Sequence, residues 1–227
     1  MRSQRSGWHK RCFFEMKPYY DHAGITIYHG DCREILPEIK ADAVVTDPPY
    51  GMNYVANKQT GPNSRGRKPG IKSRSHGSRV FGDKEKPSLS FVDQYQKCLV
   101  WGFHHYPEQL GAGSVLVWIK RVDTAFGSFL SDADLAWVKG GCGVYCFRDL
   151  SLQGGYRHHP TEKPLPLMLW CIQKVKVEPG EIILDPFMGS GTTLRAAKDL
   201  GRKAIGIEIE ERYCEIAAKR LAQEVLF

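Results

Sequence analysis

The sequence predicts an α/β fold with a mainly parallel sheet and helices on both faces. Short apolar runs alternate with helix-like stretches along most of the 227 residues, and this alternation is typical of a parallel sheet covered by helices. Two of the apolar runs end in an acidic residue and a turn, at Asp47 and at Asp185.

The individual elements follow from the apolar pattern along the chain. Short runs bounded by Gly, Pro or Asp predict strands, and apolar side chains three or four residues apart predict helices. The expected strands cover 25–28, 42–46, 114–119, 181–184 and 203–207, and the expected helices cover 32–39, 88–105, 164–176, 192–200 and 210–224. Residues 133–138 and 143–147 look like two more strands, joined as a hairpin over 139–142.

The turn Asp47-Pro48-Pro49-Tyr50 follows the apolar run 43–46 directly. Two successive prolines fix the backbone and remove two amide donors, so carbonyl oxygens stay unpaired beside a carboxylate and a flat phenol. Fixed acceptors next to a stacking surface suit an exocyclic amine on a nucleobase. A plain turn that ends a strand is the alternative interpretation.

A second turn, over 185–193, has the features of a nucleotide-binding unit. An apolar strand ends in Asp185, and Gly189 and Gly191 then allow the backbone to approach a ligand closely. Thr192 or Thr193 is expected to cap the helix that follows. Glu208 ends the next strand, about 20 residues on, where an acidic side chain binds ribose hydroxyls. No Lys precedes the threonines, which excludes a phosphate-binding P-loop.

The two turns together resemble the DNA amino-methyltransferases that use S-adenosylmethionine, the N-4/N-6 DNA methylase family. His29-Gly30-Asp31-Cys32 is similar to the adenine-contacting segment of that family, and 159–164 is similar to its His-Pro-Thr-Gln-Lys-Pro segment, with Glu162 in place of Gln. The resemblance runs from about residue 16 to 222. It implies a Rossmann-like methyltransferase fold with a circularly permuted motif order, in which the catalytic motif comes first and the cofactor motif last.

The resemblance also implies roles for individual residues. Asp47 and the Pro48 carbonyl would accept hydrogen bonds from the target amine, with Pro49 shaping the turn and Tyr50 stacking on the flipped base. Asp rather than Ser at position 47 favours adenine N6 over cytosine N4. The implied S-adenosylmethionine site comprises Asp31, Cys32, Thr161, Lys163, Asp185, Phe187, Gly189, Ser190, Gly191, Thr192 and Glu208. An RNA amino-methyltransferase and a catalytically silent DNA-binding protein stay open as alternatives.

The net charge of +7 is concentrated in one segment. Residues 53–86 hold nine basic and two acidic side chains, while the rest of the chain is balanced. This segment is also rich in Gly, Ser and Pro, so we expect a mobile loop that binds the phosphates of double-stranded DNA. Its candidate contacts are Lys58, Arg65, Arg67, Lys68, Lys72, Arg74 and Arg79.

The expected organisation is a basic N-terminal extension over 1–15 and a single methyltransferase domain over 16–227. The basic loop and a small insert at about 121–158 are the segments available to recognise a DNA sequence. The small size is compatible with a homodimer, and the sequence does not indicate whether a restriction endonuclease acts with the protein.

Composition sets further bounds. No apolar run is long enough to span a membrane, and residues 1–15 lack the apolar core of a secretory signal. Seven cysteines without a dense disulfide pattern favour a reducing cytoplasm. The compact size suits a protein of bacterial or phage origin. Cys142 and Cys146 lie near His158 and His159, but their spacing fits zinc sites poorly, so no metal is expected.

Overall fold

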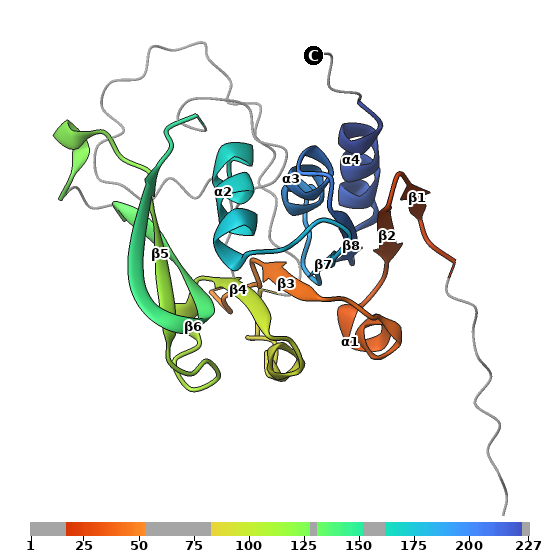
Figure 1. The fold of residues 1–227 in the computed structure, drawn as a ribbon, viewed down its shortest axis with the longest axis horizontal. Coiled ribbons are helices and arrows are strands. Elements are labelled where there is room, and N and C mark those ends of the chain that lie inside the picture. The colour runs from red at the N-terminus through yellow and green to blue at the C-terminus, as the bar shows by residue number, and fades with distance from the viewer. Residues whose placement is uncertain (1–16, 53–82, 128–130, 152–161, 224–227) are drawn as a thin grey trace, which may run out of the picture.

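A computed structural model describes residues 17–52, 83–127, 131–151 and 162–223 (Figure 1). The predicted extension 1–15 and most of the basic loop 53–86 lie outside these residues. In the described part of the chain, no helix is long and apolar enough to cross a membrane.

Eight strands form one sheet in the order β1-β2-β8-β7-β3-β4-β6-β5. The strands are β1 (Tyr20–His22), β2 (Ile25–His29), β3 (Ala43–Thr46), β4 (Lys97–Trp101), β5 (Gly113–Ile119), β6 (Ala133–Arg148), β7 (Ile182–Asp185) and β8 (Lys203–Glu208). The five central strands from β2 to β4 are parallel, while β1 is antiparallel to β2. The predicted α/β fold with a mainly parallel sheet is confirmed.

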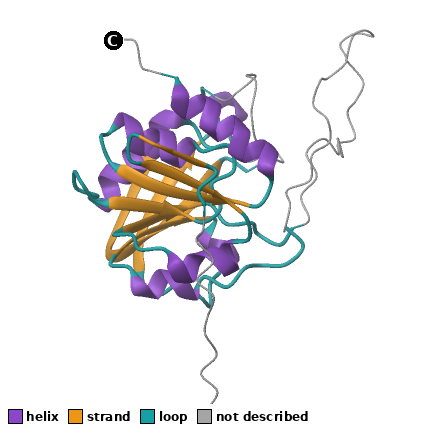
Figure 2. Ribbon diagram, turned by 90° about the vertical axis from the view of Figure 1, so that its right-hand side faces the viewer, coloured by secondary structure: helices purple, strands orange, loops and turns teal. Residues whose placement is uncertain are grey.

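Helices cover both faces of this sheet (Figure 2). The helices are α1 (Cys32–Ile35), α2 (Leu165–Val175), α3 (Thr192–Asp199) and α4 (Glu211–Ala222), and short 3-10 turns cover Leu36–Glu38, Ser90–Gln94, Phe103–His105 and Asp123–Ala125. Helices α2, α3 and α4 lie on one face, and α1 lies on the other (Figure 1).

The core has two layers because the central strands are buried on both sides. Val45 packs with the apolar side chains of α2, α3 and α4, whereas its neighbour Val44 packs with Ile35 and Tyr106 on the opposite face. Successive side chains of a strand point to opposite faces, so an uninterrupted apolar run is what a doubly covered parallel strand requires.

The predicted helix over 88–105 is wrong. This stretch contains a 3-10 turn, the strand β4 and a second 3-10 turn. Four consecutive residues of β4, from Cys98 to Trp101, are completely buried, and Gly102 ends the strand with φ 67°. A short run that is apolar all round fits a buried strand as well as a buried helix, and pairing with β3 decides the outcome here.

The predicted hairpin over 139–142 is also wrong, although the chain does reverse there. Gly140 and Gly141 have φ values of 79° and 68°, and the strand β6 bends at this point. Residues 133–139 run antiparallel to β5, and residues 144–148 run parallel to it. The two halves of β6 therefore lie on either side of β5 (Figure 1), which places residues 133–148 of the expected insert within the sheet.

Candidate active site

Four parallel strands end at the same edge of the sheet and bring the two predicted turns together. Strands β2, β8, β7 and β3 are neighbours, so Asp31, Glu208, Asp185 and Asp47 follow one another along this edge. A cavity of about 540 Å³ lies there. Its lining comes from residues 30–33, 47–50, 83–87, 162–163, 185–190 and 207–210.

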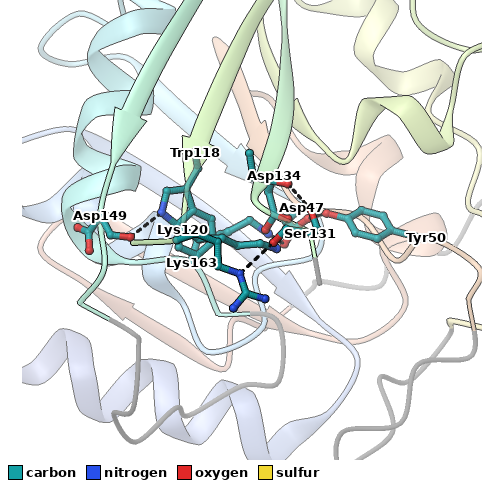
Figure 3. Close-up of polar contacts among 10 residues, drawn as sticks. Asp47, Tyr50, Trp118, Lys120, Ser131, Asp134, Asp149 and Lys163 are labelled. Atoms are coloured by element: carbon teal, nitrogen blue, oxygen red, sulfur yellow. Dashed lines mark hydrogen bonds and ion pairs between the residues drawn. The ribbon is translucent and has the colours of Figure 1, made fainter. Parts of the chain in front are cut away.

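The Asp47 carboxylate is held from both sides (Figure 3). Its Oδ2 atom accepts a hydrogen bond from Lys163 Nζ at 2.6 Å, and its Oδ1 atom accepts one from the Tyr50 hydroxyl. The Lys163 side chain is only 8% exposed, and its ammonium lies 5.2 Å from the centre of the Trp101 ring. Burial, and then the nearby Asp47 charge, raise the pKa of Tyr50 well above its usual value, so Tyr50 is a neutral donor.

Residues far along the chain support the rest of this turn. The Tyr106 hydroxyl donates to the Pro49 carbonyl, and the buried Asp83 carboxylate accepts from the amides of Gly51 and Met52 at 2.7 and 3.3 Å. The resemblance and the sequence pattern did not indicate either residue, because no local spacing links them to the Asp47 turn.

The Tyr50 ring stacks against His105. Their ring centroids are 4.6 Å apart, with an angle of 20° between the planes. The pKa of His105 is lowered by burial and by the charges of His104 and Lys86, so its ring is neutral at pH 7. One face of Tyr50 is thus already occupied by an aromatic ring, which fixes the orientation of the phenol.

Two buried carboxylates mark the cofactor side of the cavity. Complete burial raises the pKa of Asp185 to about 6, although hydroxyls of Thr193 and Thr46 counteract this shift. Burial also raises the pKa of Glu208 to about 7. The Glu208 carboxylate accepts from the amide of Gly189 at 3.0 Å, which ties the end of β8 to the glycine-rich turn.

The glycine-rich turn requires its second glycine. Gly191 has φ 77° and is the N-cap of α3, and a Cβ atom at this position would lie 2.7 Å from the Cβ of Ala217. The expected capping by a threonine side chain is wrong, since α3 has no side-chain cap. The Thr192 hydroxyl instead contacts Arg220, and the Thr193 hydroxyl contacts Asp185.

The predicted adenine-contacting residues lie across the cavity from the glycine-rich turn. Asp31 is the N-cap of α1 and accepts from the backbone amide of Arg33 at 2.9 Å. The Arg33 side chain also binds Asp31 and lowers the pKa of that carboxyl. Burial raises the pKa of the Cys32 thiol to about 11, so Cys32 offers its backbone rather than a thiolate.

Some predicted residues have a further contact or lie outside the described part of the chain. Lys163, expected beside the cofactor carboxylate, lines the cavity and also forms an ion pair with Asp47. Thr161 and the predicted phosphate contacts lie outside the described residues, as do His158 and His159. These phosphate contacts are Lys58, Arg65, Arg67, Lys68, Lys72, Arg74 and Arg79. Cys142 and Cys146 are exposed free thiols.

Known proteins are similar to this chain in sequence over part of its length and in fold over most of it. Residues 132–219 match the family model described as DNA methylase. Type II methyltransferase M2.DpnII of Streptococcus pneumoniae is 52% identical over 66 residues, which cover 29% of this chain and 24% of that protein. The chain spans less than a third of the length of the curated relatives it matches.

Two solved structures have the same fold. The M1.HpyAVI–SAM complex is 24% identical with a TM-score of 0.52, and the match covers 88% of this chain and 100% of the other. PvuII DNA methyltransferase (cytosine-N4-specific) is 16% identical with a TM-score of 0.60, and the match covers 94% and 92%. Residues 132–219 are thus similar to the DNA methylase family, and the chain shares its fold with a solved DNA methyltransferase.

Proposed function

We propose that the protein transfers a methyl group from S-adenosylmethionine to the N6 amine of an adenine in double-stranded DNA. One observation carries this proposal. The Asp-Pro-Pro-Tyr turn and the glycine-rich turn, 138 residues apart between Asp47 and Asp185, line the same cavity at neighbouring strand ends. The family match of residues 132–219 supports the same reaction.

The cavity fits a nucleoside-type cofactor. Its volume of about 540 Å³ lies within the range of small-molecule sites, and the glycine-rich turn lines it from Asp185 to Ser190. Glu208 would bind the ribose hydroxyls, Asp31 and the Cys32 backbone the adenine, and Phe187 and Gly189 the methionine part. The further contacts that we propose are Asp185, Ser190, Gly191, Thr192, Thr161 and Lys163. When bound, the cofactor supplies an electrophilic methyl group.

The residues of the Asp47 turn orient the target amine. An ionised carboxylate has several lone pairs, so Asp47 can accept from the amine while it binds Tyr50 and Lys163. Tyr106 binds the Pro49 carbonyl, and the Pro48 carbonyl would accept the second amine hydrogen. Two such bonds would orient the nitrogen lone pair toward the cofactor side of the cavity, and most of the rate gain would come from this positioning.

Tyr50 is placed to stack on a base that has left the duplex. The amine is engaged in pairing inside the helix, so the base must be extruded to reach Asp47. His105 stacks on one face of the Tyr50 ring, and Tyr50 also lines the cavity, where we propose that it contacts the base. Stacking of a base on an aromatic side chain contributes about 1–3 kcal/mol.

Two segments that begin and end near the edge of this cavity are candidates for DNA contact. Asp83 binds the amides of Gly51 and Met52, so both ends of the basic segment 53–82 are attached at the Asp47 turn. The connection 120–132 leaves β5 and returns to β6 at the same edge, where Lys120 and Asp134 form an ion pair of 2.5 Å (Figure 3). We infer that the first segment binds phosphates and the second contributes to sequence recognition.

The N4 amine of cytosine is the second candidate acceptor. PvuII DNA methyltransferase, which shares the fold, is cytosine-N4-specific, and the Asp47 turn recognises an amine rather than a particular ring. The same hydrogen bonds serve either base.

Methyl transfer from labelled S-adenosylmethionine to unmethylated genomic DNA, followed by nucleoside analysis, tests the proposal. We expect N6-methyladenine, and we expect Asp47→Ala to lower the rate by about 10²-fold or more. Asp21→Ala, on β1 and outside the cavity, is the control and should be as active as the wild type. N4-methylcytosine would keep the mechanism and overturn the base. Methylation of RNA alone, or binding of DNA without any methyl transfer, would contradict the proposal.

A further inference from the structure

Arg220, on α4, binds three separate parts of the chain behind the glycine-rich turn. Its Nη1 group donates to the Ser190 carbonyl at 2.9 Å, to the Ser190 hydroxyl at 3.1 Å and to the Thr192 hydroxyl at 3.3 Å. The same group forms an ion pair of 2.9 Å with Glu162. Both side chains are largely buried, with 19% exposure for Arg220 and 6% for Glu162.

Glu162 lies next to Lys163, whose ammonium binds Asp47. Two adjacent residues therefore form ion pairs with different parts of the site. One pair reaches the glycine-rich turn through Arg220, and the other reaches the catalytic carboxylate. Pro164 is the N-cap of α2, and its carbonyl accepts from the amide of Met168 at 3.1 Å. Glu162 and Lys163 precede this cap and have no regular secondary structure, so their ion pairs contribute to fixing their position.

We propose that Arg220 and Glu162 are positioning residues that couple the glycine-rich turn to Asp47. This inference rests on the proposed function. Arg220 holds the backbone of Ser190 in place, and through Glu162 it fixes the segment that carries Lys163. A guanidinium is suited to this task because it presents several donors in a rigid plane, which a lysine ammonium does not.

The coupling predicts two separate effects when Arg220 is removed. Loss of the contacts to Ser190 and Thr192 loosens the glycine-rich turn, which lowers cofactor affinity. Loss of the contact to Glu162 allows Lys163 to shift, which misaligns Asp47 and lowers the rate even when the cofactor is saturating. A pair that only stabilised the fold would change the melting temperature without either effect.

Binding of S-adenosylmethionine, measured by isothermal titration calorimetry, is the first readout. For Arg220→Gln we expect the Kd to rise about 10- to 100-fold, the factor expected for charge-assisted hydrogen bonds. Lys219→Gln is the matched control, since it removes the adjacent, exposed ion pair of α4 with Glu215, and its Kd should equal that of the wild type. Binding by the wild type with an unchanged Kd in Arg220→Gln would overturn the inference alone. No binding by the wild type would overturn the proposed function and this inference with it.

The double variant Arg220→Gln/Glu162→Gln separates positioning from stability. Arg220→Gln leaves a largely buried carboxylate without its guanidinium, which lowers the melting temperature. Neutralising Glu162 as well should restore much of the melting temperature but not the Kd, because the contacts to Ser190 and Thr192 are still missing. A Kd that recovers together with the melting temperature would show a purely structural role and overturn the inference.

The rate of methyl transfer at saturating cofactor tests the link to Asp47. We expect kcat to fall about tenfold in Arg220→Gln and to stay at the wild-type value in Lys219→Gln. A wild-type kcat in Arg220→Gln, with a raised Kd, would overturn the coupling between the two turns.

Discussion

At the residue scale, the Asp47 turn depends on side chains that are distant in sequence. Lys163, Tyr106 and Asp83 each donate to or accept from this turn. The motif itself could be predicted from four consecutive residues, because its chemistry is local. The residues that bind the turn could not be predicted, because single donors and acceptors spread over 80 residues form no recognisable sequence pattern.

Tyr106→Phe tests one of these supports. The variant loses the hydroxyl that binds the Pro49 carbonyl but keeps the ring in the core, where Tyr106 is 1% exposed. We expect kcat to fall about 3- to 10-fold with an unchanged Kd for S-adenosylmethionine, and the free energy of unfolding to fall by about 1 kcal/mol. Tyr28→Phe, on β2 and outside the cavity lining, is the control. An equal loss of rate in both variants would contradict a specific role for Tyr106.

Because Glu208 has a raised pKa, we expect the affinity for S-adenosylmethionine to depend on pH. Burial raises its pKa to about 7, while ribose hydroxyls would donate to the ionised form. The Kd for S-adenosylmethionine should therefore fall as the pH rises from 6 to 8, by up to about tenfold per unit below the pKa. Titration calorimetry at several pH values measures this, and Glu208→Gln should bind more weakly with little dependence on pH in the same window.

The same group should make the free protein less stable as the pH rises. The folded state holds the Glu208 proton more tightly than the unfolded chain, whose glutamates have a pKa of 4.5. The free energy of unfolding therefore falls between about pH 4.5 and pH 7, by about 3 kcal/mol from this residue. Glu208→Gln should remove this part of the pH dependence in chemical denaturation, and a profile identical to the wild type would contradict it.

At the element scale, the strands that end in a motif could be predicted from the sequence. The strands whose identity depends on pairing with a distant strand could not. β3, β7 and β8 each combine an apolar run with an acidic end, and the predictions for them are confirmed. β4 was predicted as a helix because its run is apolar on all sides. The hairpin in β6 was wrong because β5 lies between the two halves, and no local pattern records that a distant strand separates two segments.

The turn of β6 should be sensitive to a single methyl group. Gly141 has φ 68°, and a Cβ atom there would lie 2.6 Å from the Ser114 hydroxyl. We expect Gly141→Ala to lower the free energy of unfolding by about 1–2 kcal/mol, measured by chemical denaturation. Gly111→Ala is the control, since no atom lies within 4 Å of its added Cβ, and it should change stability little. An equal free energy of unfolding for the two variants would contradict the close contact between residue 141 and Ser114.

At the scale of the whole molecule, the excess positive charge is concentrated in one segment. The net charge of +7 equals the excess within residues 53–86. Of the described residues of this segment, 83–86 line the cavity, while its candidate phosphate contacts, from Lys58 to Arg79, precede them in the sequence. DNA affinity should therefore depend on a segment that contributes little to cofactor binding.

Neutralising part of this segment should change the salt dependence of DNA binding. Each phosphate contact contributes about 0.9 to the slope of log K against log salt. Replacing Arg65, Arg67, Lys68 and Lys72 by Gln should reduce the slope by up to about 3.6, without changing the Kd for S-adenosylmethionine. Fluorescence anisotropy with a duplex at several salt concentrations measures this.

A charge-matched variant is the control for this experiment. It replaces four exposed lysines outside the cavity lining by Gln: Lys17, Lys40, Lys176 and Lys203. Its slope should stay close to that of the wild type. An equal reduction in both variants would show that DNA responds to the total charge rather than to this segment.

The strand order has a consequence for how the protein is made. β2 and β3 emerge early from the ribosome, yet in the sheet β8 and β7 lie between them. β2 has β1 on its other side and β3 has β4, so each keeps one edge open, the edge that faces β8 or β7, until nearly the whole chain has been translated. Long-range parallel pairing of this kind is slow, and open strand edges aggregate readily. A nascent chain that stalls before β7 should thus depend on chaperones, because the strands that complete its sheet are the last ones synthesised.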